Sequence, residues 1–212
     1  MVEKRTLLIF PYNGNGIEAL SCVGDAYKFI GFVDDTPAKM GIAPCGYPVF
    51  GRDAFAEYPD AFVLAVPGSP ESYQVRQEII IGLGLKNERF AKLVHPDARV
   101  SPLAVIGINV LIMAGVVITS NAIIGSHICI LPNTVIHHDV KVDDWALIGS
   151  NVTIAGNTII EKNSYIGSGS SIKNGLRIGS KALIGLGSNV VKNVENSSKV
   201  AGNPARVLIK KS

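Results

Sequence analysis

From residue 106 onward, the chain carries Ile or Val at every sixth position. Asn, Gly or Asp often follows three positions later, as Asn109, Asn121 and Asn133 do. An amphipathic helix repeats near 3.6 residues and a half-buried strand repeats at 2, so a period of six fits neither. The row consists of Ile106, Ile112, Ile118, Ile124, Ile130, Ile136, Val142, Ile148, Ile154, Ile160, Ile166, Ile172, Ile178, Ile184 and Val190.

A period of six predicts a short strand and a corner, repeated along the chain. Three such sides close one triangular coil of 18 residues, with the row pointing inward. Asn and Gly tolerate the left-handed backbone conformation that corners often need. The fifteen positions therefore predict five coils, stacked into a prism ~24 Å tall at the usual strand spacing. Val94 and Val100 extend the phase upstream.

Residues 1–92 lack this repeat, and their apolar runs alternate with helical segments. Such alternation predicts a small α/β domain with a parallel sheet. The loops after the first three strands carry Gly, Asn, Asp or Ser, and ligands bind at that end of a parallel sheet. The expected strands are 6–10, 29–33, 62–66 and 90–94, and the expected helices are 14–27 and 71–83.

The first of these loops leaves three interpretations open. Gly14 and Gly16, with Ala19 and an acidic residue about 20 positions on, satisfy the fingerprint of a nicotinamide dinucleotide site. The domain has only half the strands of a full dinucleotide fold, so a nucleotide-linked sugar or similar phosphorylated ligand fits better. Alternatively, the glycines only make a tight turn.

Composition and charge narrow the class of protein. Hydrophobic residues make up 47% of the chain, which excludes disorder. The net charge of +3 contains no block of like charges, which argues against nucleic-acid binding. The apolar stretch 103–118 is too short to span a membrane. With no signal peptide and three scattered cysteines, we expect a cytoplasmic protein that is not inserted in a membrane.

The candidate chemistry lies in one corner of the prism. His137, His138 and Asp139 interrupt the regular repeat where side chains project outward. A His needs little change in pKa to act as a general base near neutral pH. An ordinary solvated corner is the alternative. No third ligand or helpful carboxylate accompanies the histidines, so we predict no metal site, and we expect a structural role for Cys129.

The chain combines a small N-terminal α/β domain, a junction at His95-Pro96, five coils and a closing segment 200–205 (VAGNPA). This combination resembles one family over essentially the whole chain. It is the bacterial sugar acetyltransferase family, which includes sialic acid O-acetyltransferases and nucleotide-linked amino-sugar N-acetyltransferases of the bacillosamine and perosamine types. The resemblance implies a small Rossmann-like N-terminal domain (residues 1–92), a left-handed parallel β-helix of hexapeptide repeats (93–195) and a C-terminal tail (196–212).

The resemblance also implies roles for individual residues. The segment 134–139 (TVIHHD) matches the family's V-I-x-His-acid pattern, with His138 as the base and Asp139 as its partner. Gly156 would offer its N–H to the thioester carbonyl. Ser168, Leu186 and Leu147 would contact coenzyme A, with Leu147 standing where some members have a second histidine. The sugar nucleotide would contact Asn13, Gly14, Asn15, Asp34, Asp35 and Pro67.

The implied function is N-acetylation of a nucleotide-linked amino sugar, a precursor of a cell-surface polysaccharide or glycan, with acetyl-CoA as co-substrate and no metal. The amine would attack the thioester directly, in a homotrimer. The family's loop usually opens with Gly and carries a His, whereas Pro11 and Tyr12 precede Asn13 here. Two alternatives are O-acetylation of a free sugar such as sialic acid and a non-catalytic hexapeptide-repeat binding protein.

Overall fold

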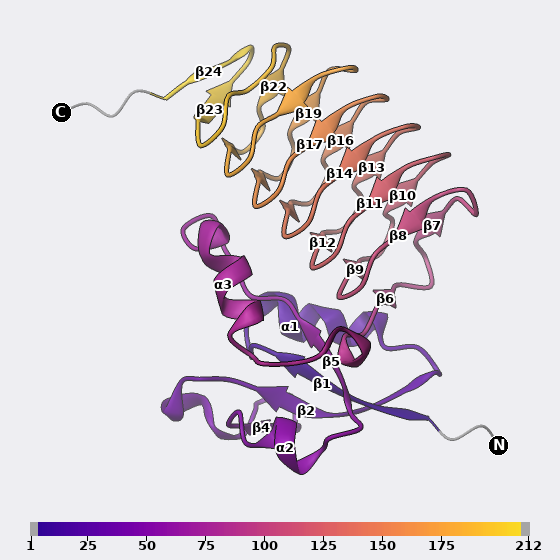
Figure 1. Ribbon diagram of the computed structural model, residues 1–212, viewed down its shortest axis with the longest axis vertical. Helices are drawn as coiled ribbons and strands as arrows, with labels where there is room; N and C mark the ends of the chain where they lie inside the picture. Colours follow the sequence, from indigo (N-terminus) through magenta and orange to yellow (C-terminus); the bar gives the residue numbers. More distant parts are fainter. Residues whose placement is uncertain (1–3, 209–212) are drawn as a thin grey trace.

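The computed structural model describes residues 4–208 as a small α/β domain joined to a long three-sided prism (Figure 1). The prism is a parallel β-helix. Its interior row is fully buried from Ile112 to Val190, which confirms the predicted repeat. Strands pair with the strand 18 residues later, as Cys129 with Leu147, and this stacking fits the left-handed β-helix of the family resemblance.

The prism has three faces. Face 1 contains β6 (Leu93–Val94), β9 (Leu111–Ile112), β12 (Cys129–Ile130), β15 (Leu147–Ile148), β18 (Tyr165–Ile166), β21 (Leu183–Ile184), β23 (Lys199–Gly202) and the antiparallel β24 (Ala205–Val207). Face 2 contains β7 (Arg99–Val100), β10 (Val117–Ile118), β13 (Val135–Ile136), β16 (Thr153–Ile154), β19 (Ser171–Ile172) and β22 (Asn189–Val190). Face 3 contains β8 (Val105–Ile106), β11 (Ile123–Ile124), β14 (Lys141–Val142), β17 (Ile159–Ile160) and β20 (Arg177–Ile178).

Corners between the strands form three edges, which we name by the faces they join. Edge 1/2 includes residues 113–116, 131–134, 149–152, 167–170 and 185–188. Edge 2/3 includes 119–122, 137–140, 155–158 and 173–176, and edge 3/1 includes 107–110, 125–128, 143–146, 161–164 and 179–182. At most corners one residue has φ between 51° and 73°, and Asn, Asp or Gly usually occupies it, as predicted.

The prism is longer than five coils. Seven parallel strands of face 1, from β6 to β23, enclose six turns. The added turn begins with Val94 and Val100, whose phase matches the row. Lys199–Gly202 continues face 1, so the prism passes the expected boundary at residue 195. Residues 209–212 of the expected tail lie outside the described part of the chain.

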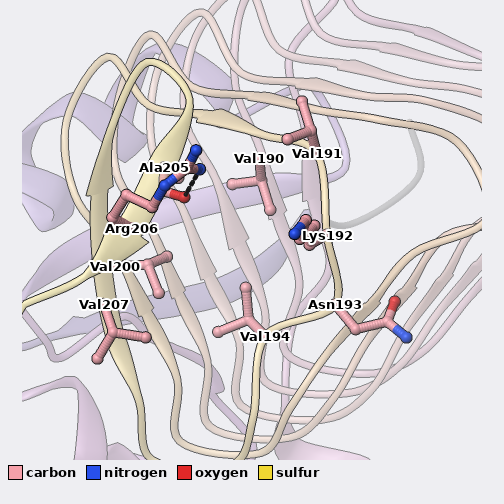
Figure 2. Close-up of a pocket in the computed structure, with 9 residues that line it drawn as sticks. All are labelled: Val190, Val191, Lys192, Asn193, Val194, Val200, Ala205, Arg206 and Val207. Atoms are coloured by element: carbon pink, nitrogen blue, oxygen red, sulfur yellow. Dashed lines mark hydrogen bonds between the residues drawn. The ribbon is translucent and has the colours of Figure 1, made fainter.

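The last coil leaves an open cavity of about 240 Å³ at the C-terminal end of the prism. Val190, Val194 and Val200 form its apolar wall beside β24 (Figure 2). Lys192 and Arg206 lie at the same end. Val190, the last residue of the interior row, therefore lies beside this cavity while its side chain stays buried.

The N-terminal domain is built on one five-stranded sheet in the order β3-β4-β2-β1-β5. All neighbouring strands are parallel except β3 and β4. Its elements are β1 (Arg5–Phe10), α1 (Gly14–Glu18), the 3-10 helix η1 (Ala19–Cys22), β2 (Tyr27–Val33), η2 (Pro37–Lys39), β3 (Gly41–Ile42), β4 (Pro48–Phe50), α2 (Ala54–Glu57), β5 (Phe62–Ala65), η3 (Tyr73–Val75), α3 (Arg76–Ile81) and η4 (Asn87–Arg89).

Three expectations about this domain were wrong. The helix predicted to reach residue 27 ends at Cys22, because Val23 turns to an extended conformation. The strand predicted at 90–94 forms only a bridge from Phe90 to Val63, and Leu93–Val94 joins the prism instead. The antiparallel pair β3–β4 was not expected.

The domain packs against face 1 of the prism. One cluster joins Leu7, Ile9 and Phe32 of the domain to the outward residues Leu111 and Cys129 of face 1. Figure 1 shows the domain below the first coils, with α3 rising beside them. Among residues 4–208, no helix is long and apolar enough to cross a bilayer.

Candidate functional site

His138 and Asp139 lie together on edge 2/3, immediately after β13. Asp139 takes the left-handed position of this corner, with φ of 58°. Its Oδ2 lies 2.8 Å from His138 Nδ1. The hydrogen bond with His138, followed by one with Asn121, lowers the pKa of Asp139. The carboxylate is therefore ionised at neutral pH and accepts a hydrogen bond from Nδ1–H of His138, which leaves Nε2 as the unprotonated ring nitrogen.

Gly156 lies one coil above His138 on the same edge. A Cβ at Gly156 would lie only 2.7 Å from both Cε1 and Nε2 of His138, so the imidazole packs directly on the glycine backbone. Within residues 4–208 the Gly156 N–H donates to no acceptor. The structure thus brings His138, Asp139 and Gly156 together on edge 2/3.

Asn121 was missed by the sequence reasoning. Its Nδ2 donates to Asp139 Oδ1 at 3.1 Å, so Asp139 is held between Asn121 and His138. Asn121 precedes Asp139 by 18 residues, which places it one coil below on edge 2/3. The repeat itself could have found it, since residues one coil apart are neighbours.

Ser168 and Leu186 lie on a different edge from His138. Both are on edge 1/2, where Ser168 Oγ accepts the Ser150 N–H at 3.0 Å and the Leu186 side chain is exposed. Face 2 therefore separates these two residues from His138 within one chain.

A groove lies at the foot of edge 1/2, against the N-terminal domain. It has a volume of about 390 Å³ and is lined by Ala114, Pro132 and Ser150 of the edge and by Ile17 and Glu18 of α1. Five residues of edge 1/2 follow one another at intervals of 18 residues and form a column along the prism: Ala114, Pro132, Ser150, Ser168 and Leu186. The groove thus continues the column that contains the two expected coenzyme contacts.

The expectation that Leu147 contacts coenzyme A was wrong. Its side chain is 3% exposed on face 1 and packs in the cluster shared with the N-terminal domain. The position cannot reach a ligand because the domain covers it. Cys129 is buried in the same cluster, and burial raises the pKa of its thiol to about 12, so it is not a nucleophile.

The first loop of the N-terminal domain holds Asn13, Gly14 and Asn15 at the carboxyl end of β1. Asn13 caps α1 by accepting the Gly16 N–H at 2.8 Å. The space around Gly14 is open, with no heavy atom within 4 Å of an added Cβ. These residues form an accessible edge with free surface at Gly14.

Asp34, Asp35 and Pro67 are already engaged within the chain. Burial raises the pKa of Asp34, but hydrogen bonds from Thr36 and Lys39 outweigh burial, and the net pKa is lowered. Asp35 pairs with Arg52 through two bonds of 2.6 and 2.7 Å. The Pro67 carbonyl accepts from Arg76. These three residues lie at the predicted edge, but their polar groups hold the loops in shape.

The part of the chain from 4 to 208 contains no cluster of three or more His, Cys, Asp or Glu residues that could hold a metal ion.

The fold is similar to the folds of solved acetyltransferases. The chain is similar to the acetyltransferase domain of PglB from Neisseria gonorrhoeae FA1090, solved in complex with acetyl coenzyme A, with a TM-score of 0.84, 27% identity, and coverage of 97% of this chain and 100% of that one. A mutant perosamine N-acetyltransferase from Caulobacter crescentus, in complex with CoA and GDP-perosamine, shares the fold at TM-score 0.83 and 22% identity, covering 99% of both chains. WeeI from Acinetobacter baumannii AYE shares it at TM-score 0.81 and 24% identity, covering 97% of this chain and 100% of that one.

A family model described as the GMPPB C-terminal domain matches residues 90–184, which lie in the prism and its junction. A search of curated protein sequences found no match. The structural likenesses confirm the expected enzyme class, an acyltransferase.

Proposed function

We propose that this chain transfers the acetyl group of acetyl-CoA to the amine of a nucleotide-linked amino sugar, with His138 as the general base. The observation that carries the proposal is the packing of the His138 ring on Gly156 while Asp139 engages Nδ1. The 27% identical PglB domain, solved with acetyl coenzyme A, supports the choice of donor.

In the proposed reaction, the amine nitrogen attacks the thioester carbonyl carbon directly. Nε2 of His138 accepts the proton of the attacking amine. When the C–S bond breaks, the protonated ring returns this proton to the sulfur, and coenzyme A leaves as the thiol. The Gly156 N–H donates to the oxygen of the tetrahedral intermediate. A positioned base contributes ~10²–10⁴-fold to the rate, and one oxyanion donor contributes about 10²–10³.

The placement of the two halves favours an oligomer as the active form, and the family resemblance implies a homotrimer. The N-terminal domain packs on face 1, and edge 2/3 with His138 is the edge opposite that face. An acceptor held by the domain therefore lies on the far side of the prism from the base of its own chain. A second copy that places its edge 2/3 against the groove at edge 1/2 would complete the site.

A thiol-release assay tests the proposed function. The purified protein is mixed with acetyl-CoA and a panel of UDP-, dTDP- and GDP-linked amino sugars, with free sialic acid alongside. Release of coenzyme A with one nucleotide-linked amino sugar alone supports the proposal and identifies the nucleotide. Release only with the free sugar acid would replace it with O-acetylation. If the protein binds acetyl-CoA but releases no coenzyme A with any member of the panel, the proposed acceptor class is contradicted.

A further inference from the structure

Edge 3/1 carries a column of unusual corner residues. Asn109, His127, Trp145, Asn163 and Lys181 follow at intervals of 18, each with φ between 51° and 61°. Asn and His are enriched in this left-handed region, whereas Trp and Lys rarely adopt it. Contacts outside the corner must therefore hold them, and all five lie on the edge beside the N-terminal domain.

The first members of the column bind the domain directly. The Asn109 side chain accepts the Ala65 N–H at 2.8 Å and donates to the Ala65 carbonyl at 2.9 Å, at the end of β5. His127 Nδ1 lies 3.1 Å from Asn109 Nδ2. The His127 ring stacks on Trp145, with centroids 5.6 Å apart, and meets the Phe90 ring edge-on at 5.0 Å.

Arg76 crosses from the domain into this column. Its side chain is fully buried, and burial lowers the pKa of the guanidinium to about 10. It donates to the carbonyls of His127 at 2.7 Å and Trp145 at 3.3 Å, and also to the carbonyl of Pro67. Within residues 4–208 no carboxylate pairs with it. A buried cation without a counterion is costly, so its carbonyl partners must be held in place.

Arg76 also shapes the loop that follows β5. Gly68 has φ of 125°, and a Cβ there would lie 2.8 Å from Arg76 Cδ. Arg76 thus joins the Pro67–Gly68 turn, at the ligand-binding end of the sheet, to two corners of the prism.

We propose that Arg76, Asn109, His127 and Trp145 form an interdomain clamp, and that Arg76 is a positioning residue for acetyl transfer. The inference rests on the proposed function, in which the domain holds the acceptor and the prism holds the donor. Reacting atoms must approach to about 3–3.5 Å, and a 1 Å misplacement can cost ~10²-fold in rate. The clamp fixes the acceptor loop relative to the prism, so it affects the transfer step rather than the binding of either ligand.

The chain offers a matched control for Arg76. Arg89 also donates to backbone carbonyls, those of Phe55, Tyr58 and Ala61, but all of them lie inside the N-terminal domain. We expect Arg76→Met to lower kcat by about 10- to 100-fold, with the Kd for acetyl-CoA and for the nucleotide sugar unchanged in calorimetry. Arg89→Met lowers thermal stability and leaves kcat unchanged below the melting temperature.

Trp145 reports on the clamp without any turnover, because it is the only tryptophan in the chain. Arg76→Met should shift its emission to longer wavelength and increase quenching by acrylamide, and Arg89→Met should do neither. If Arg76→Met does not fold, Asn109→Gly serves instead, since it keeps the left-handed corner and removes both bonds to Ala65.

Unchanged emission and kcat in a folded clamp variant would overturn the proposal, as would equal losses in the Arg76 and Arg89 variants. Loss of ligand affinity instead of kcat would also overturn the positioning role. If the wild-type protein transfers no acetyl group to any acceptor, the proposed function fails and the positioning role fails with it. The Trp145 emission of the variants then still decides whether the clamp joins the two domains.

Discussion

His127 and His138 occupy corners of the same prism, and their surroundings differ in nearly every respect. His138 lies on edge 2/3 with its side chain 58% exposed and a carboxylate at Nδ1. His127 lies on edge 3/1, is 9% exposed, and is enclosed by Trp145 and Phe90.

The difference shows that the edge decides what an imidazole can do. Burial lowers the pKa of His127 to about 4, so the ring stays neutral and serves packing. The side chain of His138 is exposed, as the proposed base requires, while Asp139 engages its Nδ1. Edge 3/1 contacts the N-terminal domain, whereas His138 on edge 2/3 remains exposed.

Replacing the exposed histidine gives the largest expected effect. His138→Ala should lower turnover by at least ~10², because the positioned base is lost. Thiol release under saturating substrates measures it, and circular dichroism confirms that the prism survives. His137→Ala is the control and should cost much less. Activity of His138→Ala within a few-fold of wild type would remove His138 from the mechanism, and the reverse ranking would move the base to His137.

Acidification tests the buried histidine. Neutral His127 is favoured in the folded chain, so the unfolded chain binds the proton more readily between pH 6.5 and about 4. Stability is therefore complete above pH 6.5 and falls as the pH drops through this window, by about 3 kcal/mol. Urea denaturation across the window measures this dependence. His127→Asn, whose side chain suits the left-handed corner, should flatten it, and an equal slope in both proteins would argue against a buried neutral imidazole.

A methyl group added at Gly156 tests whether the His138 ring must pack on this glycine. Gly156→Ala places a Cβ 2.7 Å from His138 Nε2 and displaces the ring, so we expect kcat to fall about tenfold with the fold intact. Steady-state kinetics measure the change. Gly24→Ala is a suitable control, since an added Cβ there meets nothing within 4 Å. Wild-type kcat in Gly156→Ala would show that the ring does not rest on this glycine during turnover.

Removing Asn121 should have the smallest effect. Asn121→Ala deletes one hydrogen bond to Asp139 and leaves the bond to His138, so kcat should fall about threefold. Asp139→Asn in the same kinetic assay should cost more, because it removes the charge beside His138. If Asn121→Ala lowers kcat as much as Asp139→Asn does, Asn121 does more than hold Asp139 in place.

Much of the fold followed from periodicity, whereas the candidate roles of His138 and Gly156 followed from the family resemblance. The row from Ile112 to Val190 is interior, and the 18-residue coil brings His138 and Gly156 together. Asn121 precedes Asp139 by the same 18 residues, so the repeat also predicts that these two residues are neighbours. The fifteen positions of the row predict only five coils, and the sixth turn is formed by strands that contain Val94 and Val100, upstream of the row.

The remaining features depend on residues far apart in the chain. Leu147 reads as an outward position of the prism, and only the domain packed on face 1 buries it. Arg76 reads as an ordinary charged residue of a helix, and only the folded chain places it against the carbonyls of His127 and Trp145.

By itself, the sequence determined the repeat, the corners and the His138–Asp139 pair, because these depend on local backbone preference and on neighbours at fixed spacing. The tertiary structure alone decided which face of the prism the N-terminal domain covers. Burial is a property of the whole chain, and it encloses His127 among aromatic rings while the side chain of His138 stays exposed.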